Sequence, residues 1–342
     1  MKISIIIPVF NKENYLDECL ISATTQTLDD IEIVCVNDGS TDNSQKILEK
    51  YSSEDSRIKI IKQDNHGPGY ARNEGLKIAG GEYIFFLDAD DWIEKDTLEK
   101  LYDDAKKNDS QLVLFNALEH LPDNQFRKRI YYSEDIPNTF DFHQKKDIVM
   151  NNFLIVCTKL HKNEFIKENH LAFSDTGLFE DVFFHIKSMI RAKKVSYVNE
   201  IFYNYRRTET NTRQSKSIQN KKSHEFLQVL DEIKVFLTQE QVYQQLEENY
   251  VNFKLTELKN LFENNEDKKE FFDLLKDDFD KNVINEGLLK NISVDKRNFY
   301  LSIKESENFE DYQRSINKDN LKINDSNKIF SHIKNLTKKY FF

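Results

Sequence analysis

The sequence predicts an α/β fold in which a mostly parallel sheet is covered by helices, followed by a C-terminal helical region. Three observations support this class. Short apolar runs alternate with amphipathic stretches in the first part of the chain, each apolar run ends in polar residues, and helical spacing dominates after about residue 216. Continuous apolar strands separated by helices are typical of parallel sheets that are buried on both faces.

The expected strands and helices alternate along the chain. Apolar runs predict strands at 3–7, 31–36, 58–61, 83–87 and 112–115. Apolar residues at helical spacing predict helices at 13–26, after residue 42, at 70–79 and at 95–107. A second block, residues 146–213, is expected to contain a helix at 181–191 and short strands at 195–198 and 201–205.

Composition and charge limit the classes of partner. The chain has 342 residues, a net charge of −10 and a pI of about 5.4, which argues against nucleic acid as the main partner. Three widely spaced cysteines provide neither a zinc spacing nor a disulfide framework, as is usual in a reducing cytosol. No apolar run approaches the ~20 residues of a membrane-spanning helix. No signal peptide is visible, and we expect a cytoplasmic protein.

The C-terminal residues 326–342 form a basic amphipathic pattern, with Ile329, Phe330, Ile333 and Leu336 near one helical face. Such a helix can lie on an anionic membrane, which would make the protein peripheral at the inner face of the cell membrane. The alternative is a helix that packs on the protein's own body. The sequence leaves both open.

A cluster of carboxylates directly follows the strand predicted at 83–87. Ligands of open α/β sheets bind at the carboxyl ends of strands, where Asp88 and Asp90 are expected. These two carboxylates can share a hard divalent cation, Mn²⁺ or Mg²⁺, which completes its coordination with waters and substrate phosphates. The alternative is that Asp88, Asp90 and Asp91 cap the helix that follows.

Four motifs in this order resemble glycosyltransferase family 2, whose members have the A-type glycosyltransferase fold. The motifs are Pro8-Val9-Phe10-Asn11, Asn37-Asp38-Gly39-Ser40-Thr41-Asp42, Gly67-Pro68-Gly69-Tyr70-Ala71-Arg72-Asn73 and Asp88-Ala89-Asp90-Asp91. Glu180-Asp181 resembles the acidic pair in the acceptor half of that family. The resemblance covers roughly residues 1–213 and implies an inverting transfer of a sugar from a nucleotide-sugar.

The resemblance implies a donor site formed by Pro8, Phe10, Lys12, Asp38, Arg72, Asp88 and Ala89. In this interpretation Asp38 accepts a hydrogen bond from the base, which favours uracil, unless it only forms an Asx-turn. Phe10 either packs on the base or belongs to the core. Lys12 and Arg72 contact the diphosphate unless they are solvated surface charges.

The same resemblance implies that Asp90 binds the metal and that Asp88 contacts the ribose or shares the ion. The ion would neutralise the pyrophosphate leaving group as the glycosidic bond breaks. Asp181 is expected to be the general base that takes the proton of the attacking acceptor hydroxyl. The alternative is that Glu180 and Asp181 simply begin a helix, where acidic residues favour the dipole.

We therefore predict a metal-dependent inverting glycosyltransferase that uses a nucleotide-sugar, most simply a UDP-sugar, and a glycan or lipid-linked acceptor. The expected regions are 1–116 for the nucleotide-sugar, 117–215 for the acceptor and 216–342 as the helical region. A nucleotidyltransferase and a catalytically inactive nucleotide-binding subunit of a glycan-assembly complex are the alternatives. Oligomers are compatible with the sequence.

Overall fold

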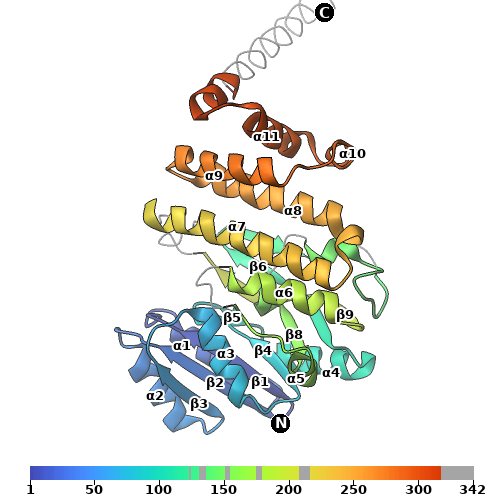
Figure 1. Ribbon diagram of the computed structural model, residues 1–342. Coiled ribbons are helices and arrows are strands. Elements are labelled where there is room, and N and C mark those ends of the chain that lie inside the picture. The colour runs from blue at the N-terminus through green and yellow to red at the C-terminus, as the bar shows by residue number, and fades with distance from the viewer. Residues whose placement is uncertain (123–124, 131–135, 151–154, 175–178, 208–215, 317–342) are drawn as a thin grey trace, which may run out of the picture. The chain divides into compact units, whose positions relative to one another are not determined.

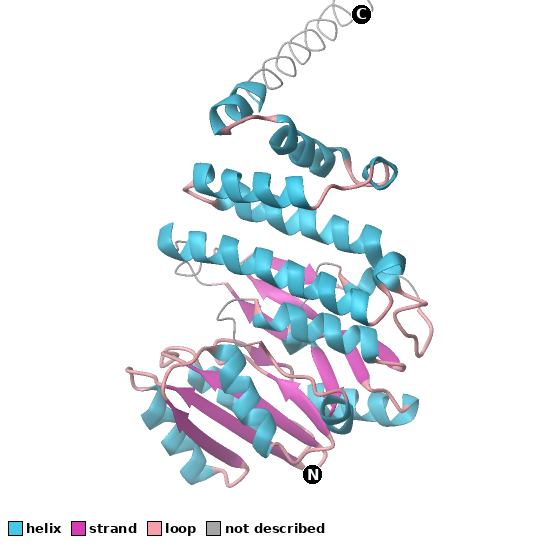
Figure 2. Ribbon diagram, viewed as in Figure 1, coloured by secondary structure: helices cyan, strands magenta, loops and turns pink. Residues whose placement is uncertain are grey.

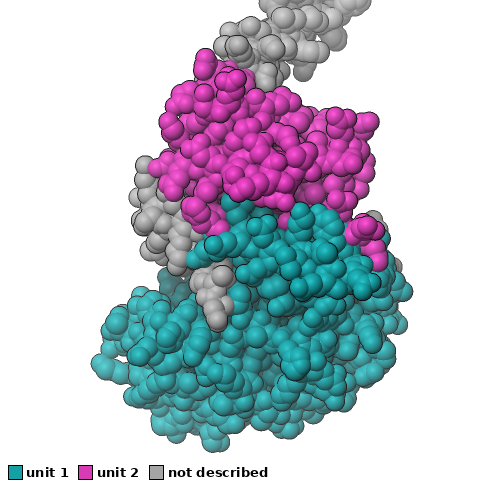
Figure 3. All heavy atoms as spheres, in the orientation of Figure 1, with its two compact units in different colours: residues 1–214, 225–243 teal, residues 215–224, 244–342 magenta. Residues whose placement is uncertain are grey.

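The structure is a computed structural model that describes residues 1–122, 125–130, 136–150, 155–174, 179–207 and 216–316. The chain divides into two compact units (Figure 3). Unit 1 comprises residues 1–214 and 225–243, and unit 2 comprises residues 215–224 and 244–342. The two units are described separately below.

Unit 1 is built on a sheet whose strand order is β3-β2-β1-β4-β8-β6-β9-β5 (Figure 1). The short strand β7 pairs with β6. The strands are β1 (Ile3–Val9), β2 (Ile31–Asp38), β3 (Ile58–Gln63), β4 (Tyr83–Phe86), β5 (Trp92–Ile93), β6 (Leu112–His120), β7 (Phe126–Arg129), β8 (Lys159–Lys162) and β9 (Val195–Arg206). The predicted α/β class is confirmed, although the sheet as a whole is mixed.

The first four strands form the parallel part of the sheet. β1 lies between β2 and β4, and its pairing with β4 ends at Ile6 and Phe86, whereas its pairing with β2 continues to Val9. Pro8 therefore lies where β1 no longer pairs with β4, so its missing N–H disrupts no ladder on that side. The chain runs from β1 to β2 and β3 on one side and then crosses to β4 on the other side of β1. The end of β1 is therefore the switch point of the strand order, where sheets of this type bind ligands.

Helices cover this parallel part. They are α1 (Leu16–Thr24), α2 (Ser44–Glu54) and α3 (Pro68–Ile78). α4 (Thr97–Asn108) packs instead on β6 and β9. α3 packs on β1 and β2 (Figure 1). A Cβ atom at Gly75 would lie 2.5 Å from Cγ2 of Ile6, so only glycine allows this close approach of α3 to β1.

The second half of the sheet adds pairings that the sequence analysis did not predict. β8 runs antiparallel between β4 and β6, β7 and β5 are also antiparallel to their neighbours, and β9 runs parallel to β6. Residues 195–206 form one strand and not the two short strands that we expected. The register between β6 and β9 shifts near Asn116, and this irregularity lets β9 continue past the exposed Asn199 and Glu200.

Four further elements complete unit 1 beside β8 and β9. They are η1 (Lys146–Val149), η2 (Val156–Thr158), α5 (Asn163–Glu168) and α6 (Glu180–Arg191). α6 was predicted at 181–191. Residues 225–239 of α7 (Lys216–Gln239) also belong to this unit, where Phe226 packs against Phe179 with ring centroids 4.8 Å apart.

Beyond β9 the described elements are all helices (Figure 2), as the sequence predicts. Unit 2 contains most of α8 (Tyr243–Asn264), with α9 (Lys268–Lys281), α10 (Glu286–Leu289) and α11 (Val294–Glu305). Its core is rich in aromatic residues, among them Phe262, Phe279 and Tyr300. In the part of the chain that is described, no helix is long and apolar enough to cross a membrane. The predicted amphipathic segment 326–342 lies outside the described residues.

A buried hydrogen-bond network at the start of β1 and β4 gives a test of this packing. Gly81 N–H donates to Ser4 Oγ at 2.8 Å, and a Cβ at Gly81 would lie 2.5 Å from the backbone nitrogen of Ser4. We expect Gly81→Ala to lower the free energy of unfolding by about 1–3 kcal/mol, since the backbone must move. The measurement is urea unfolding followed by the fluorescence of Trp92, the only tryptophan.

Gly80→Ala is the matched control. Gly80 is exposed, and its Cβ would meet nothing closer than the flexible end of Met1, at 3.3 Å. Equal destabilisation by the two substitutions would contradict the close approach at Gly81.

Candidate active site

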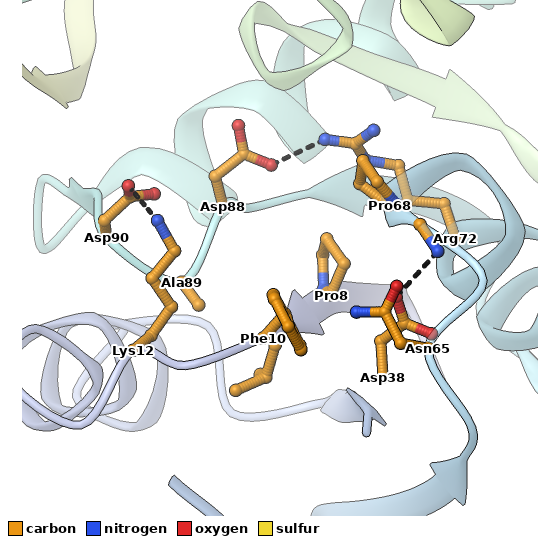
Figure 4. A pocket seen from close by; sticks show the side chains of 12 residues that line it. Pro8, Phe10, Lys12, Asp38, Asn65, Pro68, Arg72, Asp88, Ala89 and Asp90 are labelled. Carbon is orange, nitrogen blue, oxygen red and sulfur yellow. Dashed lines mark hydrogen bonds and ion pairs between the residues drawn. The ribbon is translucent and has the colours of Figure 1, made fainter. Parts of the chain in front are cut away.

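A pocket of about 440 Å³ opens at the switch point of the sheet, at the end of β1 (Figure 4). Its volume lies within the range of small-ligand sites. The lining residues come from the ends of β1, β2 and β4, from the loop between β3 and α3 and from the start of α3: Pro8, Val9, Phe10, Lys12, Asp38, Asn65, Gly67, Pro68, Arg72, Asp88, Ala89 and Asp90. The structure thus brings together all seven residues expected to bind the donor, and Asp90 with them.

Asp38 supports one wall of the pocket. Its buried carboxylate accepts hydrogen bonds from the backbone N–H groups of His66 at 2.9 Å and Gly67 at 2.8 Å, and from Gln63 Nε2 at 2.7 Å. The Asx-turn alternative is wrong for Asp38, because its carboxylate bonds to Gln63 and to the backbone of the loop before α3. The neighbouring Asn37 accepts from Ser40 N–H at 3.0 Å. Asp38 therefore fixes the loop that leads into α3 and still lines the pocket.

Phe10 and Lys12 follow β1 and lie on the pocket wall in Figure 4. The ring of Phe10 is not part of the core, since 44% of the residue is exposed. Lys12 is not a solvated surface charge, because its ammonium forms an ion pair with Asp90 across the pocket. An apolar ring and a fixed cation therefore line the same cavity.

Arg72 lies in the first turns of α3 and is buried, so it is not a surface charge either. Its Nη2 donates to Asp88 Oδ1 at 2.7 Å, and its Nη1 donates to Glu180 Oε1 at 2.8 Å. Glu180 is buried as well. One guanidinium thus joins the acidic loop after β4 to the first residue of α6, a link that sequence spacing does not reveal.

The acidic loop does not cap the following helix. α4 begins at Thr97, well after Asp91, and its N-cap position is Asp96. Asp91 is instead buried, and it accepts from the Tyr203 hydroxyl at 2.6 Å and from Arg206 N–H at 2.7 Å. Asp91 therefore anchors the loop to β9, while Asp88 and Asp90 remain at the pocket.

Asp181 is the second residue of α6, so the alternative that Glu180 and Asp181 begin a helix also holds. Asp181 is not among the residues that line the pocket. Burial, followed by the neighbouring Glu180, raises the pKa of Asp181 to about 7, although Arg72 acts to lower it. Asp88 contributes to the same shift, so the carboxylate of Asp181 responds to the charges of the pocket.

The sequence analysis missed Lys159, the first residue of β8. Lys159 is fully buried, and its ammonium donates to the backbone carbonyl of Ile155. Burial lowers the pKa of Lys159 to about 7, and the charge of Asp181 is the largest opposing influence. The sequence signal was a lysine beside apolar residues in Cys157-Thr158-Lys159-Leu160, but the buried position depends on the pairing of β8 with β4 and β6.

The two carboxylates at the pocket fit a divalent cation only with help from a ligand. Among the described residues no group of three or more histidine, cysteine, aspartate or glutamate side chains could hold a metal ion. Asp88 and Asp90 supply hard oxygen donors, and substrate phosphates and water commonly complete such a shell. Each of the two also contacts a cation of the protein, Arg72 and Lys12 respectively.

Comparison with known proteins agrees with this geometry. The family model described as glycosyl transferase family 2 matches residues 4–160. Glycosyltransferase GlyG of Streptococcus pneumoniae serotype 4 is 31% identical over 218 residues, which are 60% of this chain and 70% of GlyG. Poly(ribitol-phosphate) beta-glucosyltransferase of Bacillus spizizenii is 35% identical over 214 residues, 60% of this chain, and the chain spans only 32% of that relative's length.

Among solved structures, Staphylococcus aureus TarS 1–349 in complex with UDP-GlcNAc is similar with a TM-score of 0.70. The two chains are 22% identical, and the match covers 91% of this chain and 89% of TarS 1–349. At this identity the likeness shows the fold, and it agrees with the A-type glycosyltransferase fold expected from the motifs.

The Arg72 bridge gives a test of the site's architecture. Arg72→Met leaves the buried carboxylate of Glu180 without its cation, and we expect a loss of about 3–5 kcal/mol in the free energy of unfolding. Glu180→Gln in the same chain should recover part of the loss, because the uncompensated charge is then absent. Chemical denaturation of the two single variants and the double variant measures the coupling. Strictly additive effects would contradict a direct bridge.

Proposed function

Because the chain belongs to glycosyltransferase family 2, we propose that it transfers a sugar from a nucleotide-sugar to a hydroxyl group of a glycan or lipid-linked acceptor, with inversion. The observation that carries the proposal is the Arg72 bridge. It connects the pocket carboxylate Asp88 to Glu180, which directly precedes the carboxylate expected to act as base, Asp181. In this proposal one set of buried ion pairs positions both the donor pocket and the catalytic base.

The proposed donor is a UDP-sugar. The pocket combines an exposed aromatic ring, Phe10, with the carboxylate of Asp38, and these suit stacking on a base and acceptance of a hydrogen bond from it. Lys12 and Arg72 line the same pocket and provide cations for the diphosphate. The complex of TarS with UDP-GlcNAc supports this choice of nucleotide by analogy of fold.

Asp88 and Asp90 would hold a Mn²⁺ or Mg²⁺ ion together with the donor's phosphates. When bound, such an ion supplies Lewis-acid stabilisation of the leaving diphosphate. Lys12 and Arg72 contribute positive charge to the same region, and they also hold the two carboxylates in place.

Asp181 would act as general base. A carboxylate with a pKa near 7 is deprotonated in a large fraction of molecules at neutral pH and is a stronger base than an ordinary aspartate. It would take the proton of the acceptor hydroxyl while the oxygen attacks the anomeric carbon from the side opposite the diphosphate. Inversion follows from this backside attack.

The proposed biological role is synthesis of surface polysaccharides or related glycans. One relative is named for transfer to poly(ribitol-phosphate), which supports a polymeric acceptor. The chain spans only 32% of that relative's length.

A panel of nucleotide-sugars tests the proposal. We expect release of UDP from one UDP-sugar, stimulated by Mn²⁺ or Mg²⁺ and by an acceptor glycan. Asp181→Asn should lower the transfer rate by roughly 10²–10⁴-fold, while UDP affinity measured by calorimetry stays unchanged. Asp103→Asn, at an exposed position on α4, is the control. Binding of UDP without turnover of any donor would favour the inactive-subunit alternative.

The pH dependence follows from the raised pKa of Asp181. The base acts only when deprotonated, so kcat/KM should rise with pH through about 7 and level off above it. Lys159 acts to lower the pKa of Asp181, so Lys159→Met should shift the rise of kcat/KM to higher pH. Initial rates across pH 5 to 9 provide the measurement. If kcat/KM instead rises with an apparent pKa in the ordinary aspartate range, and Lys159→Met does not change that pKa, Asp181 is excluded as the base.

A further inference from the structure

Three arginines surround one buried carboxylate at the ends of β6 and β9. Glu119 Oε1 accepts from Arg207 Nε at 2.6 Å, and its Oε2 lies 2.9 Å from Arg129 Nη2 and 3.6 Å from Arg127 Nη1. Only 2% of the Glu119 side chain is exposed. We call Arg127, Arg129 and Arg207 the arginine cluster. Among the residues that the structure describes, Glu119 is the one carboxylate paired with these arginines, so the described part of the cluster carries excess positive charge on an acidic protein.

The cluster is open to solvent. The exposed fractions of its side chains are 57% for Arg127, 42% for Arg207 and 32% for Arg129. Two structural explanations of the cluster are possible. One arginine would be enough to neutralise the buried Glu119, and charges along a sheet edge can prevent aggregation. Three partly exposed guanidinium groups around one carboxylate provide further N–H donors, whose planar geometry matches phosphate and carboxylate groups.

The strand register places the cluster on a particular face of the sheet. Arg127 pairs with Glu119, and Arg129 pairs with Ala117. Since side chains alternate along a strand, Arg127 and Arg129 lie on the Glu119 face of β7, and Lys128 lies on the other face. Glu119 also pairs with Tyr205 of β9, so Tyr203 and Tyr205 share its face.

The sheet face that carries Glu119, Tyr203 and Tyr205 is connected to the acidic loop of the candidate active site. The Tyr203 hydroxyl donates to Asp91 of the acidic loop, and the guanidinium of Arg207 lies over the ring of Tyr205, 5.0 Å from its centroid. Burial raises the pKa of Tyr205 to about 12, and Asp91, Asp88 and Asp90 contribute to that shift. The cluster and the acidic loop therefore belong to one electrostatic environment.

We infer that the arginine cluster binds an anionic group, a phosphodiester or a carboxylate, of the acceptor chain whose hydroxyl is glycosylated. The inference rests on the proposed function and adds to it the charge class of the acceptor and a place where the acceptor is held. Donor binding and the acid–base chemistry do not involve these arginines. Their removal should therefore weaken acceptor binding and leave the donor site intact.

The experiment uses the full chain and labelled oligomers. The probes are a synthetic poly(ribitol phosphate) oligomer, an oligogalacturonate, phosphatidylglycerol vesicles, and dextran as the uncharged control. The variants are Arg127→Gln and the double variant Arg127→Gln/Arg129→Gln. Lys128→Gln is the matched control, because it removes the same charge from the same strand on the opposite face. Binding is measured by fluorescence anisotropy at several salt concentrations, and UDP affinity is measured in parallel.

We expect one of the two anionic oligomers to bind more tightly than dextran, and the preferred one identifies phosphodiester or carboxylate. The double variant should weaken that binding roughly tenfold and reduce its salt dependence. Lys128→Gln should change it by less than about twofold, and UDP affinity should be the same in all variants. If the double variant does not fold, Arg127→Gln alone, at the most exposed position, gives the same comparison.

Equal weakening by Lys128→Gln and by the double variant would overturn the inference, as would equal affinity of the unmodified protein for dextran and both anionic oligomers. Binding to phosphatidylglycerol vesicles, without binding to either oligomer, would assign the cluster to a lipid surface and also overturn it. Absence of UDP binding and donor turnover, with oligomer binding intact, would instead contradict the proposed function.

Discussion

The ion pairs of Arg72 are the interaction on which the candidate active site depends. The buried guanidinium contacts Asp88 at the end of β4 and Glu180 at the start of α6, and these residues are far apart in the sequence. A buried charge is costly unless it is paired, so the three elements hold one another in position. α3, which carries Arg72, can approach α6 because Gly69 has no side chain: a Cβ there would lie 2.7 Å from Cγ of Glu180.

A second anchor joins the acidic loop to the other half of the sheet. Asp91 receives hydrogen bonds from Tyr203 and from the backbone of Arg206, and this fixes the loop between β4 and β9. Neighbouring carboxylates thus have different roles: Asp91 is a buried support, whereas Asp88 and Asp90 stay at the pocket. The same strand, β9, continues into the arginine cluster, so the acidic loop at the pocket and the proposed acceptor site share one support.

The electrostatics of the site are a balance of buried charges rather than a single strong group. Glu180 and Asp88 raise the pKa of Asp181, whereas Arg72 and Lys159 lower it, and burial is the largest cause. In such surroundings charge interactions are much less screened than in water. The proposed base therefore depends on side chains from α3, β8 and the loop after β4, and changing any of them should alter its proton affinity.

The sequence by itself determined the alternation of strands and helices and the helical C-terminal region, and its motifs that resemble the family named residues that line the pocket. Apolar periodicity and short polar motifs at strand ends are local signals, and the switch-point rule brings such ends together. Only the tertiary structure decided that Arg72 is buried between two acids, that Asp91 supports β9, that Lys159 is inside, and that β9 is one strand. Each of these depends on pairing between distant segments, which local pattern does not encode.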